Sequence, residues 1–137
     1  MKNIIILVIS CFCGLIISAQ DKPVKIVFDI TSSDVSVHET AVKHVKLMAT
    51  SYPNSKFELV VYSAAYTMVV KNDSNVLKQM EELGSIKNVD LVVCQASLNK
   101  HKIAANELIS GVRAVPDGIL EIVEKQGLGW GYIKEAK

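Results

Sequence analysis

The stretch Asp90-Leu-Val-Val-Cys94-Gln-Ala-Ser-Leu98 decides how the rest of the chain is interpreted. Its apolar run, Leu91 to Val93, is typical of a strand that is buried on both faces, as strands of parallel sheets are. The run stops at Cys94, and polar residues that can begin a helix follow at once. In an open parallel α/β sheet, ligands bind just beyond the carboxyl ends of the strands. Cys94 is therefore the first candidate for a functional side chain.

Four further segments have the pattern of strands, and helix-forming segments separate them. The predicted strands cover residues 25–30, 56–62, a run that ends at 94, 112–115 and 130–133. Ser36-Val-His-Glu39 has the form of a capping box at the start of the first helix, and Asp117 can cap the last helix. Strands that alternate with helices on short loops predict a three-layer α/β/α domain with a five-stranded, mainly parallel sheet. The expected strand order is the flavodoxin-like 2-1-3-4-5.

Residues 1–20 have the layout of a secretory signal peptide. A basic start, Met1-Lys2-Asn3, precedes the almost entirely apolar segment 4–17, and the small residues Ser18-Ala19 follow. The apolar segment is short for a membrane span, which needs about twenty residues. We expect cleavage near Gln20, which leaves a single domain at 21–137, exported to the periplasm or secreted and without a stable membrane span. An uncleaved anchor and a lipoprotein acylated on a leader cysteine are the alternatives.

Charge and cysteine content narrow the possible partners. The chain has 15 Lys and Arg against 14 Asp and Glu, and the loss of Lys2 with the leader makes the two counts equal. Without a basic excess to hold a phosphate backbone, nucleic acid is not expected as a partner. Cys11 and Cys13 also leave with the leader, so Cys94 is alone in the mature chain. A lone cysteine in an exported protein is sheltered, paired between chains, or a free reactive thiol.

Two interpretations of Cys94 follow. In the first it is a nucleophile or sulfur acceptor, because helix amino-termini and nearby cations such as Lys100 favour the reactive thiolate. In the second it is a small apolar side chain of the core, which is common for unpaired cysteines. For the first interpretation, the pocket is expected to be lined by side chains after the second strand and after Cys94, namely Ser63, Ala64, Gln95, Ser97 and Asn99.

Other chemistries have weaker support in the sequence. His38 and His44 are six residues apart, which does not place them on one helical face, and with His101 they form no metal-ligand pattern. The glycines of 127–131 follow a helix and open a strand, which is the reverse of a dinucleotide fingerprint. Asp29 near the first strand would suit a phosphoacceptor pocket only if more carboxylates stood at the other strand ends. The sequence predicts no metal site and no cofactor.

Four segments follow one another in the second half of the chain. They are Val92-Val-Cys94, Glu107-Leu-Ile-Ser-Gly-Val112, Val115-Pro-Asp-Gly-Ile119 and Gln126-Gly-Leu-Gly-Trp-Gly-Tyr-Ile133. This ordered set resembles the DsrE/TusD-like family, in its small stand-alone branch. The resemblance implies, over residues 25–133, a flavodoxin-like fold and homo-oligomers, often trimers or hexamers. It also implies sulfur carriage, as a persulfide on the cysteine at the position of Cys94. The relay members have an arginine after that cysteine, and the loop of this chain from Gln95 to Lys100 has none.

Two functional hypotheses therefore stand side by side. In the first, the chain is an exported DsrE-like protein that carries sulfur or performs redox chemistry through Cys94, with a sulfur donor as its partner. Alternatively, it is a non-catalytic homo-oligomeric module that binds a small ligand or only assembles, and Cys94 is structural. The surroundings of the Cys94 sulfur distinguish the two.

Overall fold

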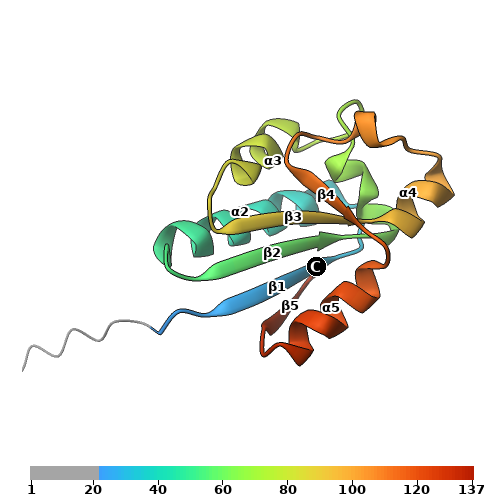
Figure 1. Cartoon of the computed structure of the whole chain (residues 1–137). Coiled ribbons are helices and arrows are strands. Elements are labelled where there is room, and N and C mark those ends of the chain that lie inside the picture. The colour runs from blue at the N-terminus through green and yellow to red at the C-terminus, as the bar shows by residue number, and fades with distance from the viewer. Residues whose placement is uncertain (1–21) are drawn as a thin grey trace, which may run out of the picture.

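A computed structural model describes residues 22–137, so the predicted leader lies outside the described residues. The described residues form a sheet of five strands that pair in parallel, and helices cover it on both faces (Figure 1). No helix among residues 22–137 is both long enough and apolar enough to cross a bilayer. The strands are β1 (Lys25–Ile30), β2 (Lys56–Val61), β3 (Val89–Cys94), β4 (Val112–Val115) and β5 (Gly131–Glu135). The α-helices are α2 (Val35–Ser51), α3 (Leu77–Gly84), α4 (Gln95–His101) and α5 (Gly118–Gly127). Two 3-10 helices, η1 (Ser63–Val69) and η2 (Ala105–Glu107), complete the described elements.

The predicted class, a parallel α/β sheet in a flavodoxin-like arrangement, is confirmed. The strand order, however, is 4-3-2-1-5 and not the predicted 2-1-3-4-5. The predicted order would have made β2 an edge strand, but β2 is buried at every position after Lys56. The observed edges are β4 and β5, whose exposed residues include Arg113 and Lys134. Apolar strands gain most at the centre of a sheet, and charged strands tolerate its edges.

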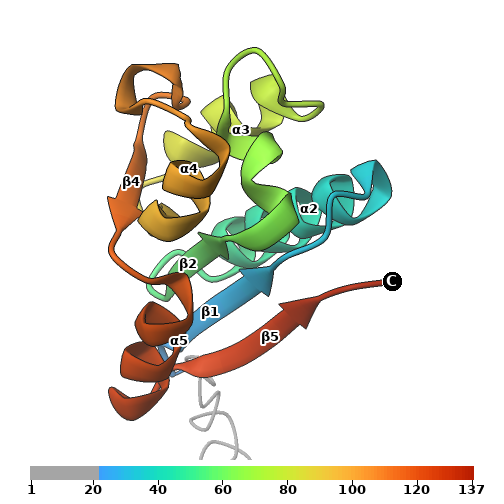
Figure 2. The same cartoon turned by 90° about the vertical axis from the view of Figure 1, so that its right-hand side faces the viewer.

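The strand order also explains why the two faces of the sheet are covered unequally. From β1 to β4 the chain steps in one direction, so right-handed crossovers place α2, α3 and α4 on the same face. The connection from β4 to β5 returns across the whole sheet, and α5 lies alone on the other face (Figure 2). The core under α5 is small and is formed by Val27, Val60, Val92, Val115 and Ile122.

Two of the three interior strands, β1 and β2, each carry one buried carboxylate on the α5 face. Successive side chains of a strand point to opposite faces, so Asp29 and Glu58 share a face with Val27 and Val60. Asp29 is 3% exposed and Glu58 is 0% exposed. A buried charge is costly unless it is paired and hydrogen bonded. The partners of these two carboxylates therefore define two polar clusters beneath α5, one toward each end of the helix.

Local capping sets the starts of the two long helices. Asp34, not the predicted Ser36, caps α2, and its Oδ1 accepts a hydrogen bond from the Ser36 amide at 2.9 Å. The predicted cap of α5 is confirmed, because Asp117 Oδ1 accepts from the amides of Ile119 and Leu120 at 2.8 and 3.2 Å. Asp117 thereby fixes where α5 begins, directly above the end of β3.

Candidate functional site

Cys94 is the last residue of β3 and the residue that precedes α4. Its backbone is extended, with φ −69° and ψ 121°, which lets the chain pass from strand to helix without a loop. The residue is buried, with 6% of its surface exposed, and it is the one cysteine among residues 22–137. The expected position of Cys94 at a strand end is therefore what the structure shows, and its thiol lies just below the surface.

The amino end of α5 packs directly against Cys94. A Cβ atom placed on Gly118 would lie 3.1 Å from the Cβ of Cys94 and 3.2 Å from the Cβ of Tyr62, closer than nearly all real contacts. Any larger residue at position 118 would require Cys94, Tyr62 or the helix to shift by a few tenths of an ångström. The amino-terminus of a helix favours negative charge through its aligned peptide dipoles. A sulfur that bears charge at Cys94 would therefore lie in a favourable field.

The structure brings some of the sequence-predicted residues together and leaves others apart. The Ser63 amide donates a hydrogen bond to Ser97 Oγ at 2.9 Å, which ties the end of β2 to the first turn of α4, next to Cys94. Ser63 has φ 55°, a left-handed conformation that costs energy for a serine. Gln95 and Asn99 are exposed and hydrogen bond to each other at 2.9 Å along α4, and Ala64 is exposed on η1.

A cluster that the sequence reasoning missed lies beside Cys94, at the carboxyl ends of β1, β2 and β5. Asp29 is its centre. Tyr132 donates to Asp29 Oδ2 at 2.6 Å, and Tyr62 does so over a longer 3.4 Å. Lys134 Nζ lies 2.9 Å from Asp29 Oδ1 and 5.6 Å from the centre of the Tyr62 ring. Together with Cys94, these side chains form a polar row across the end of the sheet.

The two tyrosine hydroxyls are held in the protonated form. Burial and the adjacent Asp29 carboxylate raise the pKa of Tyr62 to about 12. The hydrogen bond to Asp29 is the main cause that raises the pKa of Tyr132, also to about 12. Both hydroxyls therefore act as donors near neutral pH. Because these donors and the Lys134 ammonium are directed at Asp29, the row is a fixed polar surface beside Cys94 in which one ammonium group is paired with one carboxylate.

The three histidines have other roles. His38 is fully buried, contrary to the expectation of a partly exposed helix residue, and its Nε2 lies 2.7 Å from the carbonyl of Ser32. His44 pairs with Glu135 at 3.0 Å. His101 stacks on the ring of Tyr66, with 3.9 Å between the ring centres. Within residues 22–137, no three His, Cys, Asp or Glu side chains lie close enough together to hold a metal ion.

The sequence does contain a signal for the missed cluster. Asp29 is the one charge in an apolar run that forms a buried strand, and such a charge requires a partner. The partner comes from β5, where Lys134 lies directly beside Asp29 in the parallel register. That register follows from the position of β5 next to β1, and the strand order 2-1-3-4-5 would have separated the two strands.

Comparisons with known proteins agree with this architecture. The family model described as DsrE/DsrF-like matches residues 25–134. Among solved structures, MTH1491 from Methanobacterium thermoautotrophicum, a protein of unknown function, is 26% identical with a TM-score of 0.75; 81% of this chain and 98% of that chain are covered.

Two more distant structures show the same fold. The ychN protein from E. coli is 17% identical with a TM-score of 0.66, over 82% of this chain and 98% of that one. BT1422 from Bacteroides thetaiotaomicron, a conserved protein of unknown function, is 15% identical with a TM-score of 0.64, over 80% of this chain and 93% of that one. No curated protein sequence matches. On the family match, which spans nearly all the described residues, the chain belongs to the DsrE/DsrF-like family.

Proposed function

We propose that this protein is an exported sulfur carrier that holds sulfur as a persulfide on Cys94. Sulfur relay is often linked to the DsrE-like family, to which the chain belongs. The observation that carries the proposal is the contact of Cys94 with the amino end of α5, through Gly118, at the carboxyl edge of the sheet. This is the edge where open α/β sheets bind their ligands.

The proposed step is a sulfur exchange without net oxidation. The Cys94 thiolate attacks the terminal sulfur of a donor persulfide, a bond forms between the two sulfurs, and the donor leaves as its thiolate. The product on Cys94 is a persulfide anion, which the amino end of α5 stabilises. The Tyr62 hydroxyl, held protonated by burial and Asp29, belongs to the polar row beside Cys94 described above. In the reverse direction, an acceptor thiolate removes the terminal sulfur.

The slight exposure of Cys94 limits its partners. Only 6% of the residue is exposed, so a donor must present its terminal sulfur on a narrow group. Larger reagents and the thiols of other proteins have less access to a residue that is this deeply buried. We therefore expect loading by small persulfides to be faster than alkylation by bulky reagents.

The experiment uses the mature protein and its Cys94→Ser variant. Each is incubated with a small persulfide donor, and intact mass is measured after the donor has been removed. The expected result is the gain of one sulfur atom that is reversed by a reducing thiol and is absent from the variant. A native protein whose mass does not change, although Cys94 is alkylated after unfolding, would show that Cys94 is structural.

Export is the second part of the proposal, and the composition of residues 1–20 supports it. The full chain is expressed in a bacterial host, and the periplasm and cytoplasm are separated. The expected result is a periplasmic product that lacks about the first twenty residues by intact mass. A cytoplasmic product of full length would contradict export and leave the chemistry of Cys94 to its own test.

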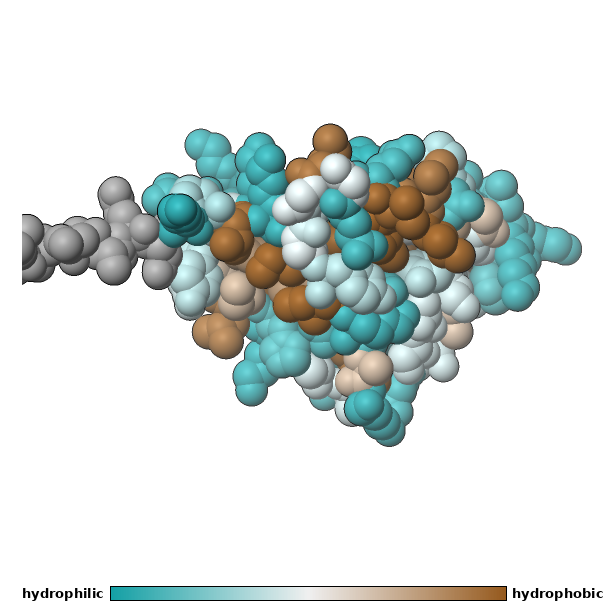
Figure 3. Space-filling model, turned by 90° about the horizontal axis from the view of Figure 1, so that it is seen from below, coloured by the Kyte–Doolittle hydropathy of each residue, from teal (hydrophilic) through white to brown (hydrophobic). Residues whose placement is uncertain are grey.

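A homo-oligomeric assembly module is the second candidate function. Its support is a group of exposed apolar side chains on α5, Ile119, Leu120 and Val123, which are 60, 52 and 57% exposed. Figure 3 views the molecule from the side of α5 and shows several apolar patches among hydrophilic side chains. Apolar surface of this kind commonly marks association. Light scattering on the purified protein should give a trimer or hexamer, and Leu120→Lys should shift it toward the monomer.

A further inference from the structure

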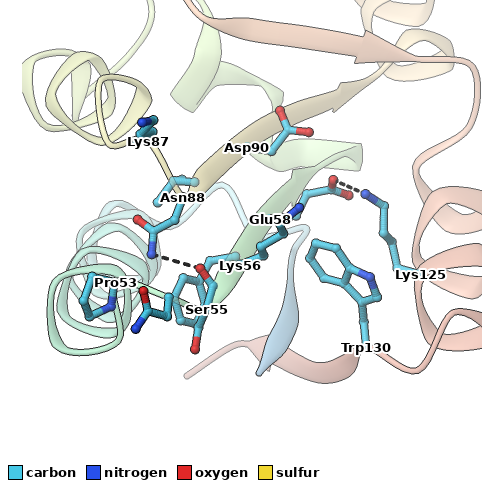
Figure 4. Close-up of a pocket in the computed structure, with 12 residues that line it drawn as sticks. Pro53, Ser55, Lys56, Glu58, Lys87, Asn88, Asp90, Lys125 and Trp130 are labelled. Carbon is cyan, nitrogen blue, oxygen red and sulfur yellow. Dashed lines mark hydrogen bonds and ion pairs between the residues drawn. The ribbon is translucent and has the colours of Figure 1, made fainter. Parts of the chain in front are cut away.

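A groove lies at the opposite edge of the sheet from Cys94, where β2 and β3 begin. It has a volume of about 400 Å³ and runs between these strand starts and the carboxyl-terminal part of α5 (Figure 4). Proteins bind small organic molecules in clefts of about this size. The lining residues that carry the argument are Lys56, Glu58, Lys87, Asp90, Lys125 and Trp130.

The charges at the inner wall of this groove do not balance. Glu58 and Asp90 are neighbours in the β2–β3 register, so two carboxylates lie side by side. Lys125 Nζ lies 2.5 Å from Glu58 Oε2, and Arg113 lies 2.8 Å from Asp90 Oδ2. A third carboxylate, Glu121, lies 3.4 Å from Lys125 and 3.8 Å from Arg113. Arg113 also lies 3.7 Å from Glu58 Oε2, so three carboxylates share two cations in this cluster, of which Glu58, Asp90 and Lys125 line the groove. When all three carboxylates are ionised, one negative charge has no partner.

In the described part of the chain, the unpaired acceptor in this cluster is a single atom, Oε1 of Glu58. Glu58 is fully buried, and its Oε1 has no hydrogen-bond partner among residues 22–137. A buried acceptor without a donor is costly, and the cost is larger for a charged group. Burial raises the pKa of Glu58 to about 7, although the Lys125 ammonium acts in the opposite direction. Either a proton or an external cationic donor completes this cluster.

The outer wall has the opposite character. Lys56 and Lys87 are exposed on the rim of the groove, and neither forms a salt bridge with the described residues. Asp90, between rim and inner wall, has a side chain that is 46% exposed. An incoming molecule therefore meets two free ammonium groups at the rim and an unsatisfied carboxylate deeper in. A simple anion would be repelled by the inner wall, and a simple amine would be repelled by the rim.

We propose that this groove binds a small zwitterion of amino-acid size. The ammonium group of the ligand donates to Glu58 and Asp90, and its carboxylate lies between Lys56 and Lys87. The ligand supplies the cation that the inner wall lacks and the anion that the rim lacks. Trp130 forms one side of the groove, with Lys125 Nζ 4.6 Å from its ring centre. Its indole is therefore close to the site where the ligand ammonium enters.

Trp130 makes the proposal directly testable, because it is the single tryptophan of the chain. The purified mature protein is titrated with glycine, γ-aminobutyrate and ε-aminocaproate, three zwitterions with increasing distance between their charges, while tryptophan emission is recorded. Butylamine and butyrate are the matched probes that carry one charge each. We expect a saturable change with at least one zwitterion, and affinity about tenfold or more weaker for both single-charge probes.

Variants assign the effect to the groove. Lys56→Ala and Lys87→Ala are exposed changes that should leave the fold intact and weaken zwitterion binding by about tenfold together. Lys43→Ala, an exposed lysine of α2 outside the groove, is the control and should bind as the wild type. Glu58→Gln should abolish binding, with circular dichroism as the check on its fold.

Several outcomes would overturn the proposal. One is the absence of a saturable change with all three zwitterions. Others are butylamine or butyrate binding as tightly as γ-aminobutyrate, and full binding by the double lysine variant. Folded Glu58→Gln that binds normally would also contradict the assigned contact. The result is independent of Cys94, whose sulfur loading is measured by mass on the same preparations.

Discussion

The two ends of α5 cover two buried carboxylates that are completed to different degrees. At the amino end, Asp29 has Lys134, Tyr132 and Tyr62 as donors, and both of its oxygens are used. At the carboxyl end, Glu58 has Lys125 on one oxygen and, within the part of the chain that the structure describes, no donor on the other. A satisfied cluster can fix the shape of a site, as we propose for the surroundings of Cys94. An unsatisfied cluster retains capacity for a proton or a ligand.

Packing against the sheet also differs between the ends of the helix. Gly118, at the amino end, lies so close to Cys94 and Tyr62 that an added Cβ would force a small shift, whereas a Cβ on Gly127 would meet no heavy atom of residues 22–137 within 4 Å. Position 118 of the helix is therefore tightly packed, and position 127 faces open space. The predictions below separate the two ends, from the largest expected effect to the smallest.

Gly118→Val should have the largest effect. The added side chain must displace Cys94, Tyr62 or the whole helix start, and overpacking of this kind costs about 3 kcal/mol in the free energy of unfolding. Urea denaturation measures the loss, and alkylation of Cys94 in the native state should become faster. Gly127→Ala is the matched control, and it should be neutral or slightly stabilising because alanine favours helix. Equal stability of the two variants would contradict the packing difference.

Asp29→Asn should have the next largest effect. The amide cannot accept from both the Lys134 ammonium and the Tyr132 hydroxyl as the carboxylate does, and hydrogen bonds to a charged group are worth about 2 kcal/mol. Chemical denaturation near pH 7 measures the loss. A variant as stable as the wild type would show that the cluster at the amino end of α5 is not a stabilising unit.

Glu58→Gln is the matched change at the carboxyl end of α5. Above neutral pH it should not lower the stability as Asp29→Asn does, and its stability relative to wild type should rise with pH. The Glu58 carboxyl has a pKa of about 7 in the folded protein, above its ordinary value of 4.5, so the folded state holds a proton that the unfolded chain releases between these values. The stability contributed by this group is full below pH 4.5 and is lost as the pH rises to about 7.

Glutamine carries no such titration. Its stability relative to wild type should therefore increase as the pH rises through this window, by about 1 kcal/mol at about pH 8 compared with about pH 5. Denaturation curves of both proteins at the two pH values give the difference in their free energies of unfolding. The titration of all other groups is common to both proteins and cancels in this difference. A difference that does not change with pH, or that decreases, would show that Glu58 is ionised throughout and fully compensated.

Removal of the two tyrosine hydroxyls should have the smallest effects, and they should be unequal. Tyr132→Phe loses a 2.6 Å hydrogen bond to Asp29, whereas Tyr62→Phe loses a contact of 3.4 Å. We expect a loss of up to about 1 kcal/mol for the first and a few tenths for the second. Thermal unfolding of both variants beside the wild type measures the order. The reverse order would mean that Tyr62 and not Tyr132 is the main donor to Asp29.

Much of the fold follows from the pattern of the sequence. The apolar runs predict β1, β3 and β4 closely, and the cap at Asp117 predicts the start of α5. The strand order was wrong because neighbours in a sheet depend on which strands need the most burial, and β2 needs more than its periodicity reveals. The first helix begins one residue earlier than Ser36 because Asp34 is free to cap it.

The candidate site is only partly visible in the sequence. Cys94, Ser63 and Ser97 are predicted to line one pocket because they follow parallel strands at the carboxyl edge of the same sheet. The direct hydrogen bond between the two serines depends on β2 and β3 being neighbours, which the predicted strand order did not include. Asp29, Lys134 and Glu58 escape such reasoning because their partners are far away in the chain and depend on the register of β5 and on the position of α5. A lone charge in an apolar strand shows that a partner exists, without showing where.

Sulfur transfer from Cys94 tests the central claim most directly. Protein loaded with a persulfide donor is freed of the donor and then mixed with a small acceptor thiol, and both intact protein mass and the persulfide formed on the acceptor are followed over time. A carrier should lose one sulfur atom from Cys94 as the acceptor gains one, and Cys94→Ser should transfer none. A protein that never loads, or whose added sulfur reaches no acceptor, would contradict the account of Cys94 as a sulfur carrier.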